Sequence, residues 1–249
     1  MPNDVTEALK HLITTFCAKD IMTSEVRLVC AKKKEEAPEV SAENPDFSVI
    51  PILSDDGLLT SYFERDSQQT RLIEVGDLVS DGTTLLDLVD ILQTRDFCFV
   101  LANRRVGGYV HYSDLNHQIM KWTFYVMLEA VERMALDSLP PAHERALLES
   151  KLPPERFKQV LSTYKRAGDN GRNLLTYLNI ADLLHLAVAT GVLRIDEESI
   201  VTMKDVRNWA AHVLFDLQPE SSIQKLATVK QECLRILGIG LTISATAGD

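Results

Sequence analysis

The sequence predicts an α+β protein in two parts, a mixed N-terminal part over residues 1–118 and an all-α part over residues 119–249. The first observation is a series of short runs rich in Val, Ile, Phe and Tyr, bounded by turn sequences such as SDDG and VSDG. The second is that only helical periodicity follows from about residue 113. The third is a shift in charge, since residues 1–120 hold 11 basic and 20 acidic residues and residues 121–249 hold 15 and 16.

The totals exclude several classes of protein. The chain has 249 residues, 45% of them hydrophobic and 25% charged, which is typical of a soluble globular protein. No apolar run approaches the roughly 20 residues that cross a bilayer, and the N-terminus is acidic and amphipathic, unlike a leader sequence. We therefore expect a cytoplasmic protein with no membrane partner. The net charge of −10 opposes nonspecific binding to nucleic acid.

The cysteines point away from a metal site. They stand at positions 17, 30, 98 and 233, and no two form a Cys-x-x-Cys pair. We expect free, buried thiols and neither a zinc site nor a disulfide framework. The chain is therefore predicted to hold no metal.

The N-terminal part is predicted to consist of strands with little helix. The predicted strands are EVRLVC (25–30), FSVIPIL (47–53), LLTSYFE (58–64), RLIEV (71–75), FCFVLAN (97–103) and VGGYVHY (106–112). Helical periodicity appears over residues 8–16 and 85–92. The segment AKKKEEAPEVSAENPD (31–46) is charged and has no clear apolar stripe, so we expect a loop or at most a short helix.

The C-terminal part is predicted to be a bundle of four or five helices with short connections. The helical patterns cover residues 113–139, 142–152, 153–167, 173–193, 203–217 and 222–238. Ser113 or Asp114 would cap the first helix, and Pro140 and Pro141 would end it. The boundary between the parts then falls near Gln118, inside this helix.

Two segments of the N-terminal part resemble each other. VIPILSDDGLLTSYFERDS (49–67) and FCFVLANRRVGGYVHYSDLN (97–116) each read as strand, turn, strand, and each closes near an aspartate. With AKDIMTSEV (18–26) ahead of them, they are similar to a tandem pair of cystathionine-β-synthase (CBS) domains over about residues 10–120. The motifs DIMT and VGGYVHYSDL carry most of the resemblance. The second copy fits better, because the first has no clear helix.

The resemblance implies a pseudo-symmetric module that binds AMP, ADP or ATP in clefts between the copies. In the family, a Thr-x-x-Asp ending holds the ribose hydroxyls. Asp114 and Asp66 match the aspartate, whereas His111 and Phe63 stand where the threonine would be. Asp114 either accepts ribose hydroxyls or only caps a helix. Asp66 is the weaker candidate, because Phe63 offers no hydroxyl.

The stretch DVRNWAAHVLF (205–215) carries the candidate chemistry of the helical part. Asn208 and His212 are four residues apart on a predicted helix, so they share a face, and Arg207 can reach round to them. An arginine can hold a phosphate, and a histidine can transfer a proton to or from ribose oxygens without a metal. His185 is expected to be a buried core residue with Asp182 as its partner.

The motif and its helical context resemble the higher eukaryote and prokaryote nucleotide-binding (HEPN) domains, over about residues 120–238. Their signature is an arginine, four to six residues and a histidine, and RNWAAH has four between Arg207 and His212. Active members are metal-independent ribonucleases, often toxins, whose motifs meet across a homodimer. The resemblance implies a homodimer with RNA as a partner of the C-terminal half. Basic residues that would extend the RNA contact are Arg156, Lys158, Lys165, Arg166 and Arg172.

Two functions follow from these resemblances. The leading prediction is a nucleotide-regulated, metal-independent endoribonuclease with Arg207, Asn208 and His212 as catalytic residues. The alternative is a protein without catalytic activity that binds adenine nucleotide, dimerises and regulates a partner. The sequence leaves the choice open, since many HEPN domains only bind or dimerise.

Overall fold

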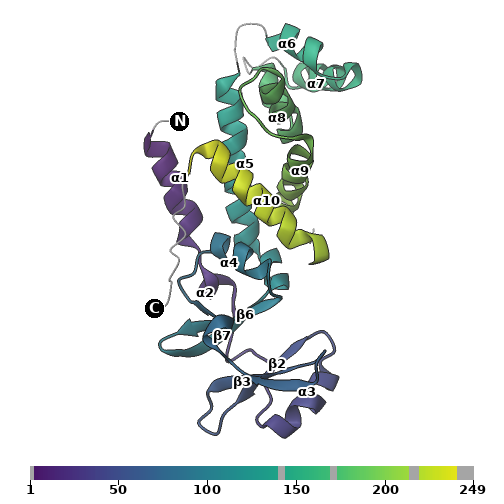
Figure 1. Ribbon diagram of the computed structural model, residues 1–249. Helices are drawn as coiled ribbons and strands as arrows, with labels where there is room; N and C mark the ends of the chain where they lie inside the picture. The colour runs from purple at the N-terminus through teal and green to yellow at the C-terminus, as the bar shows by residue number, and fades with distance from the viewer. Residues whose placement is uncertain (1–2, 140–143, 169–172, 213–218, 240–249) are drawn as a thin grey trace. The chain divides into compact units, whose positions relative to one another are not determined.

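The computed structural model describes residues 3–139, 144–168, 173–212 and 219–239 (Figure 1). By its internal contacts the chain divides into two compact units, one of residues 14–119 and one of residues 1–13 with 120–249. The first is mixed α/β and the second is helical, so the predicted α+β class is confirmed. The predicted division into 1–118 and 119–249 assigns the first helix to the N-terminal part, whereas residues up to Ile13 group with the helical unit.

The α/β unit contains two small sheets. Its elements are α2 (Ala18–Ile21), β1 (Thr23–Ser24), η1 (Lys34–Glu36), α3 (Ala37–Glu43), β2 (Val49–Leu53), β3 (Leu59–Glu64), β4 (Gln69–Leu72), η2 (Val75–Asp77), β5 (Leu78–Ser80), α4 (Leu85–Leu92), β6 (Phe97–Ala102), β7 (Arg105–His111) and η3 (Tyr112–Asn116). One sheet has the order β1-β7-β6-β5 and the other β2-β3-β4. Only the β5–β6 pair is parallel within these sheets.

The two sheets repeat one arrangement. In the second copy, β5 pairs in parallel with β6 across α4, and β7 returns antiparallel to β6. In the first copy, Ala31 bridges in parallel to Ile52 of β2 across α3, and β3 returns antiparallel to β2. A further strand joins the returning strand in each copy, β1 beside β7 and β4 beside β3. The internal repeat seen in the sequence is therefore a repeat of structure.

A cluster of aromatic rings joins the two sheets. Tyr62 of β3 lies 5.4 Å from Phe97 and 5.5 Å from Phe99 of β6, measured between ring centroids. Tyr109 of β7 stacks on Phe97 at 5.5 Å. Val49 and Leu59 are buried in the same cluster. Rings that bury large areas in edge-to-face and stacked contacts contribute much of the cohesion of a core this small.

The α/β unit differs from the sequence prediction in some of its strands. EVRLVC (25–30) forms no strand, since β1 ends at Ser24 and the next bridge is at Ala31. The charged segment 31–46 contains η1 and the short helix α3, which agrees with the prediction, and the buried residues Ala37 and Ser41 lie on α3. The short strand β5 was not predicted, since three residues give too little alternation to detect. The helix over 85–92 is confirmed as α4, capped by Thr84.

The helical unit is built from one N-terminal helix and the helices after residue 119. Its elements are α1 (Asn3–Thr15, through residue 13), α5 (Gln118–Ser138, from residue 120), α6 (Glu144–Lys151), α7 (Pro154–Arg166), η4 (Leu174–Tyr177), α8 (Ile180–Ala189), α9 (Glu197–Ala211) and α10 (Pro219–Leu237). Among the described residues, no helix is long and apolar enough to span a membrane.

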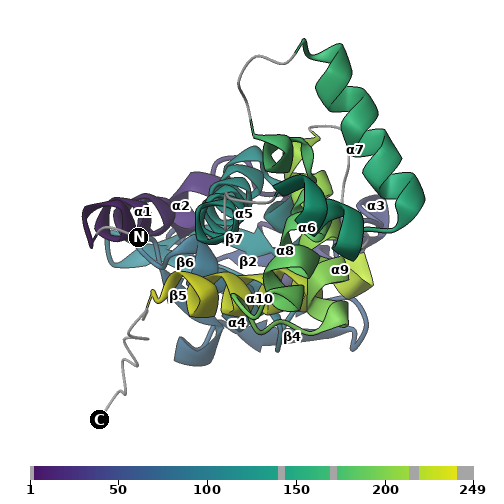
Figure 2. The same ribbon diagram turned by 90° about the horizontal axis from the view of Figure 1, so that it is seen from above.

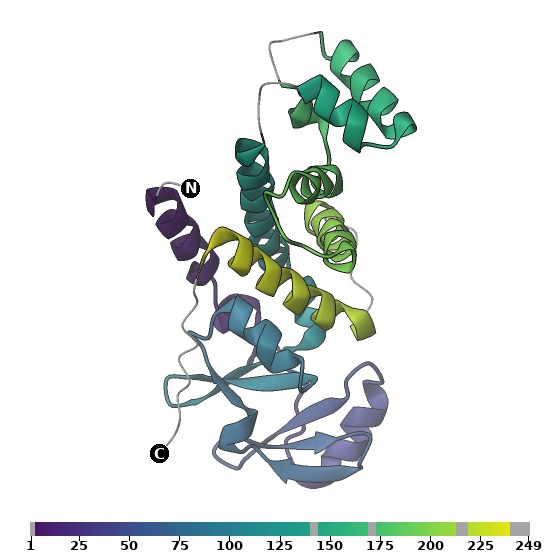
Figure 3. The same cartoon turned by 45° about the horizontal axis from the view of Figure 1, so that its top comes forward.

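The helices pack in sequence-adjacent pairs. Figures 1 and 2 show α8, α9 and α10 as neighbours. Figure 3 shows α6 and α7 beside each other next to α8. One apolar cluster holds this latter group together, formed by Leu139, Leu148, Leu152, Phe157, Val160, Leu175, Leu183 and Leu186. The unit is all-α over its described residues, as predicted.

Several helices begin at residues other than those predicted, because local capping residues determine where each helix starts. The helix expected from residue 113 begins at Gln118, because residues 112–116 form a 3₁₀ turn and His117 is extended. The pattern over 173–193 divides into η4 and α8, since Asn179 forms a capping box with Asp182. The helix expected from residue 203 begins at Glu197, where Asp196 accepts from the Ser199 N–H.

Gly108 allows β1 to pair closely with β7. A Cβ atom at this position would lie 2.6 Å from Met22 Sδ and 2.9 Å from the Thr23 carbonyl oxygen. Both distances are shorter than van der Waals contact, and the second involves backbone. The sheet order β1-β7 therefore requires glycine at position 108.

We predict that Gly108→Ala lowers the free energy of unfolding by about 1–3 kcal/mol, the usual cost of overpacking. Thermal or urea unfolding of the intact chain measures the change. Gly76→Ala is the matched control, because a Cβ atom at Gly76 meets no atom within 4 Å. Equal stability of the two variants would show that β1 and β7 can separate without cost.

Candidate functional site

The α/β unit contains a cavity at the place where its two copies meet. The cavity has a volume of about 410 Å³ and is lined from three segments, at residues 23–29, 46–51 and 109–114. The first segment follows α2, the second includes the start of β2, and the third runs from β7 into η3. A volume of this size suits a small organic ligand.

Aromatic and imidazole rings form one wall of the cavity. Tyr109 and His111 lie nearly parallel, with ring centroids 6.3 Å apart, and His111 lies 4.0 Å from Tyr112. Burial lowers the pKa of His111, so its ring is neutral at neutral pH. The His111 Nδ1 atom lies 2.8 Å from Ser113 Oγ and accepts from the Ser113 backbone N–H at 3.3 Å.

Asp114 caps a turn and also lines the cavity. Its Oδ2 atom accepts from the His111 backbone N–H at 2.8 Å, which closes the capping box of η3. Burial raises the pKa of Asp114, and the bond from His111 offsets this only in part. Oδ1 makes no hydrogen bond with the part of the chain that the structure describes. The two interpretations of Asp114 are therefore compatible, because capping occupies one of its two oxygens.

Polar side chains of the other two segments complete the lining. Arg27 and Asp46 are exposed, and within the described ranges neither side chain forms an ion pair. The Ser48 Oγ atom is buried and has no hydrogen-bond partner among the described residues. A buried hydroxyl without a partner is costly, so a ligand atom that bonds to it would gain free energy.

The lining limits the chemistry of a ligand. The rings offer faces for a flat heterocycle, the free Asp114 oxygen accepts from hydroxyl groups, and Arg27 offers a planar fork for an anion. No group of three or more His, Cys, Asp or Glu side chains suited to a metal occurs in the described ranges. The His111 Nδ1 and Ser113 Oγ atoms, both from the lining, lie 2.8 Å apart.

The other predicted ligand residue lies elsewhere. Asp66 is exposed in the turn after β3 and does not line the cavity. Phe63 is 3% exposed and packs in the core beneath α3. Arg65 binds the carbonyl oxygens of Ser41, Asn44 and Pro45 at the end of α3. The first copy thus ends in an exposed turn, where the second ends in η3.

In the helical unit, Arg207 is held by two glutamates of α5. Its Nε atom lies 2.9 Å from Glu132 Oε1, and its Nη2 atom lies 3.4 Å from Glu129 Oε2. The guanidinium also stacks on Tyr125, with its carbon 4.0 Å from the ring centroid. Burial raises the pKa of Glu132, and the charge of Arg207 opposes that shift. The Arg207 side chain is 18% exposed and ties α9 to α5.

The other two motif residues lie at the end of α9. Asn208 is exposed, and the exposed His212 is the C-cap residue that follows the last helical residue, Ala211. The His212 carbonyl oxygen accepts from the buried Lys121 Nζ at 3.4 Å. The shared helix face of Asn208 and His212 stays a prediction. The predicted catalytic role of the three residues stays a prediction.

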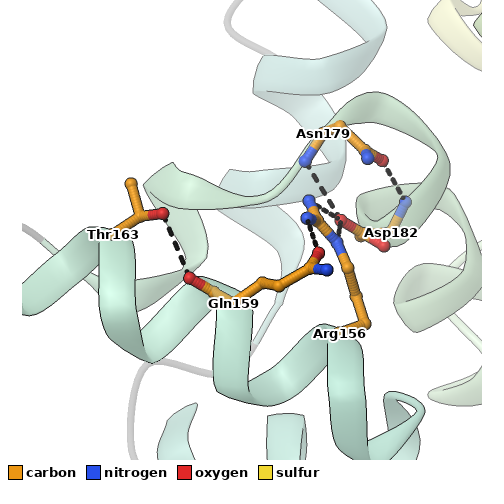
Figure 4. A network of polar contacts seen from close by, with 5 residues as sticks. All are labelled: Arg156, Gln159, Thr163, Asn179 and Asp182. Carbon is orange, nitrogen blue, oxygen red and sulfur yellow. Dashed lines mark hydrogen bonds and ion pairs between the residues drawn. The ribbon is translucent and has the colours of Figure 1, made fainter.

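A second arginine of the helical unit also has a structural partner. Arg156 of α7 bonds Asp182 at the start of α8, with Nε at 2.9 Å and Nη2 at 2.7 Å from Oδ2 (Figure 4). Asp182 is thus engaged, and His185 is exposed and pairs with Glu197 at 2.9 Å, so the expected Asp182–His185 pair is wrong. Lys158 pairs with Glu155. Lys165 and Arg166 are exposed, and Arg172 lies outside the described residues.

Sequence reasoning missed several residues of both sites. Arg27, Asp46 and Ser48 come to the cavity from segments that carry no motif, so only the fold brings them near Asp114. Tyr112 follows His111 in the motif VGGYVHYSDL, and its aromatic ring was the feature that could have marked it as a cavity residue. For Arg207, the available sign of an ion pair was two glutamates three residues apart on α5, Glu129 and Glu132.

No family model and no curated protein sequence matches the chain. Among solved structures, it is similar to the CBS domain of the bacterial CNNM/CorC family Mg²⁺ transporter in complex with ATP, with 12% identity and a TM-score of 0.36 over 48% of this chain and 97% of that chain. A second structure of that domain shows 13% identity and a TM-score of 0.36 over 48% and 86%. At this identity and TM-score the likeness assigns no ligand or activity to this chain.

We predict that Arg207→Ala destabilises the chain by about 2 kcal/mol, because it leaves the half-buried Glu132 without its partner. Chemical unfolding followed by far-UV circular dichroism measures this. The neighbouring exposed residue gives the control, and Asn208→Ala should change stability by no more than about 0.5 kcal/mol. If both variants unfold at the same denaturant concentration, the Arg207 ion pairs do not hold α9 to α5.

Proposed function

We propose that residues 14–119 form a CBS-pair module that binds an adenine nucleotide beside Asp114 and His111, and that binding regulates the helical part of the chain. The observation that carries this proposal is the meeting of rings, a carboxylate and a guanidinium in one cavity of about 410 Å³. Each group matches one part of a nucleotide.

The base, the ribose and the phosphate each have a partner in this proposal. The base stacks against the wall of Tyr109, His111 and Tyr112, an interaction worth about 1–3 kcal/mol for a base on an aromatic ring. The free oxygen of Asp114 accepts from the ribose hydroxyls. Arg27 binds phosphate.

Regulation would act through the chain that leaves the site. Asp114 belongs to η3, and α5 begins a few residues later at Gln118. A ligand that bonds Asp114 therefore acts on the turn that precedes this long helix. The ligand can shift the state of the chain only if it binds two states with different affinity.

We predict that Asp114→Asn weakens AMP binding about tenfold or more, since a neutral amide is a poorer acceptor for two hydroxyl groups than a carboxylate. Isothermal titration calorimetry with AMP, ADP and ATP measures the affinities. Asp66→Asn removes a carboxylate outside the cavity and should leave them within about twofold. Failure of the unsubstituted chain to bind any of the three nucleotides would contradict the proposal, as would equal losses in both variants.

We propose ribonuclease activity as a second function, for the helical unit alone. The observation that favours it is the exposure of Asn208 and His212 at the end of α9, on the helix that also carries Arg207. Because Arg207 is engaged by Glu129 and Glu132, an active site would need its release from them. A homodimer would bring two copies of Asn208 and His212 together, and Arg207 would have to be released in each copy.

The second proposal predicts metal-independent cleavage of RNA by the intact chain in EDTA, with loss of cleavage in His212→Ala. Asn208→Ala should reduce the rate by a smaller factor. Light scattering measures the oligomeric state in parallel. An inert unsubstituted chain would overturn this proposal and leave the nucleotide-binding proposal standing.

A further inference from the structure

The cavity wall carries little positive charge. Arg27 is its one basic side chain among the described residues, and Asp46 and Asp114 are carboxylates. His111 adds no charge at neutral pH, since burial lowers its pKa. The lining is therefore net negative by one charge before a ligand enters.

Most other arginines of the α/β unit are already engaged. Arg71 pairs with Glu64 at 2.9 Å, and Arg105 pairs with Glu25 at 2.7 Å. Arg65 and Arg95 bind backbone carbonyl oxygens. None of these four lines the cavity. They are not available to neutralise a polyphosphate there.

The three consecutive lysines lie beyond the opposite end of β2. Ala31 bridges in parallel to Ile52, so the chain at residues 32–34 continues past the C-terminal end of β2. The cavity is lined by Ser48, Val49 and Pro51 of this segment and by Val29 before Ala31. None of Lys32, Lys33 and Lys34 is among its lining residues.

We infer, on the premise of the proposed nucleotide site, that the cavity takes an adenine nucleoside with at most one phosphate and discriminates against di- and triphosphates. One guanidinium fork matches one phosphate group. Each further phosphate adds negative charge to a lining that already holds the carboxylates of Asp46 and Asp114, and among the described lining residues only Arg27 is a cation. Arg27 and Asp46 are then the residues that set the preference.

Calorimetric titration of the intact chain with adenosine, AMP, ADP and ATP tests the inference, with ATP measured with and without Mg²⁺. We expect AMP to bind about tenfold or more tightly than ATP at moderate salt. Arg27→Ala should lower the affinity for AMP about fivefold to tenfold and leave the affinity for adenosine within about twofold. Asp46→Asn should increase the affinity for ATP about threefold or more and so reduce the difference between the AMP and ATP affinities.

Lys33→Ala is the matched control, because it removes one exposed positive charge from the same unit at a residue that does not line the cavity. It should leave the ratio of AMP to ATP affinity unchanged. ATP that binds as tightly as AMP would overturn the inference while the nucleotide-binding proposal survives. The inference would also be overturned if Arg27→Ala and Lys33→Ala changed the ratio of AMP to ATP affinity equally. Absence of binding by all four compounds would remove the site itself.

Discussion

The contact between Tyr62 of the first copy and the rings of Phe97 and Phe99 of the second determines the arrangement of the α/β unit. These rings bury against each other between the two sheets. Because Tyr109 packs on the same cluster, β7 is fixed relative to β2. The turn that follows β7 is thereby brought opposite Ser48 and Val49. The cavity exists because the aromatic cluster holds these segments at a fixed separation.

The two copies show how one residue type gains different roles from different local structure. Asp66 and Asp114 follow corresponding strands, β3 and β7. Asp114 lies in a 3₁₀ turn whose capping box occupies one of its oxygens, and the residue lines the cavity. Asp66 lies in an exposed turn whose neighbour, Arg65, is bound to the end of α3. The repeat is thus conserved in its strands and broken at the turns that would carry ligand contacts.

The strands and one site residue pair were predictable, whereas the site as a whole was not. β2, β3, β6 and β7 have the alternation and turn residues that define hairpins, and the quoted motif contains both His111 and Asp114. Arg27 and Ser48 could not be placed beside them, because the contact depends on packing between segments distant in sequence. Likewise, Arg207 is 75 positions from Glu132, so its local sequence gives no sign that its charge is already paired.

The grouping of residues 1–13 with the helical unit makes that unit discontinuous in sequence. Leu9 and Ile13 of α1 are 8% and 1% exposed, so these two residues of the helix are part of a core. The α/β unit is therefore an insertion within the helical one. During synthesis, α1 emerges first and must wait for residues beyond 119 before the helical unit can close, whereas residues 14–119 can fold as soon as they are made. A fragment that starts at residue 119 would lack one of its own helices.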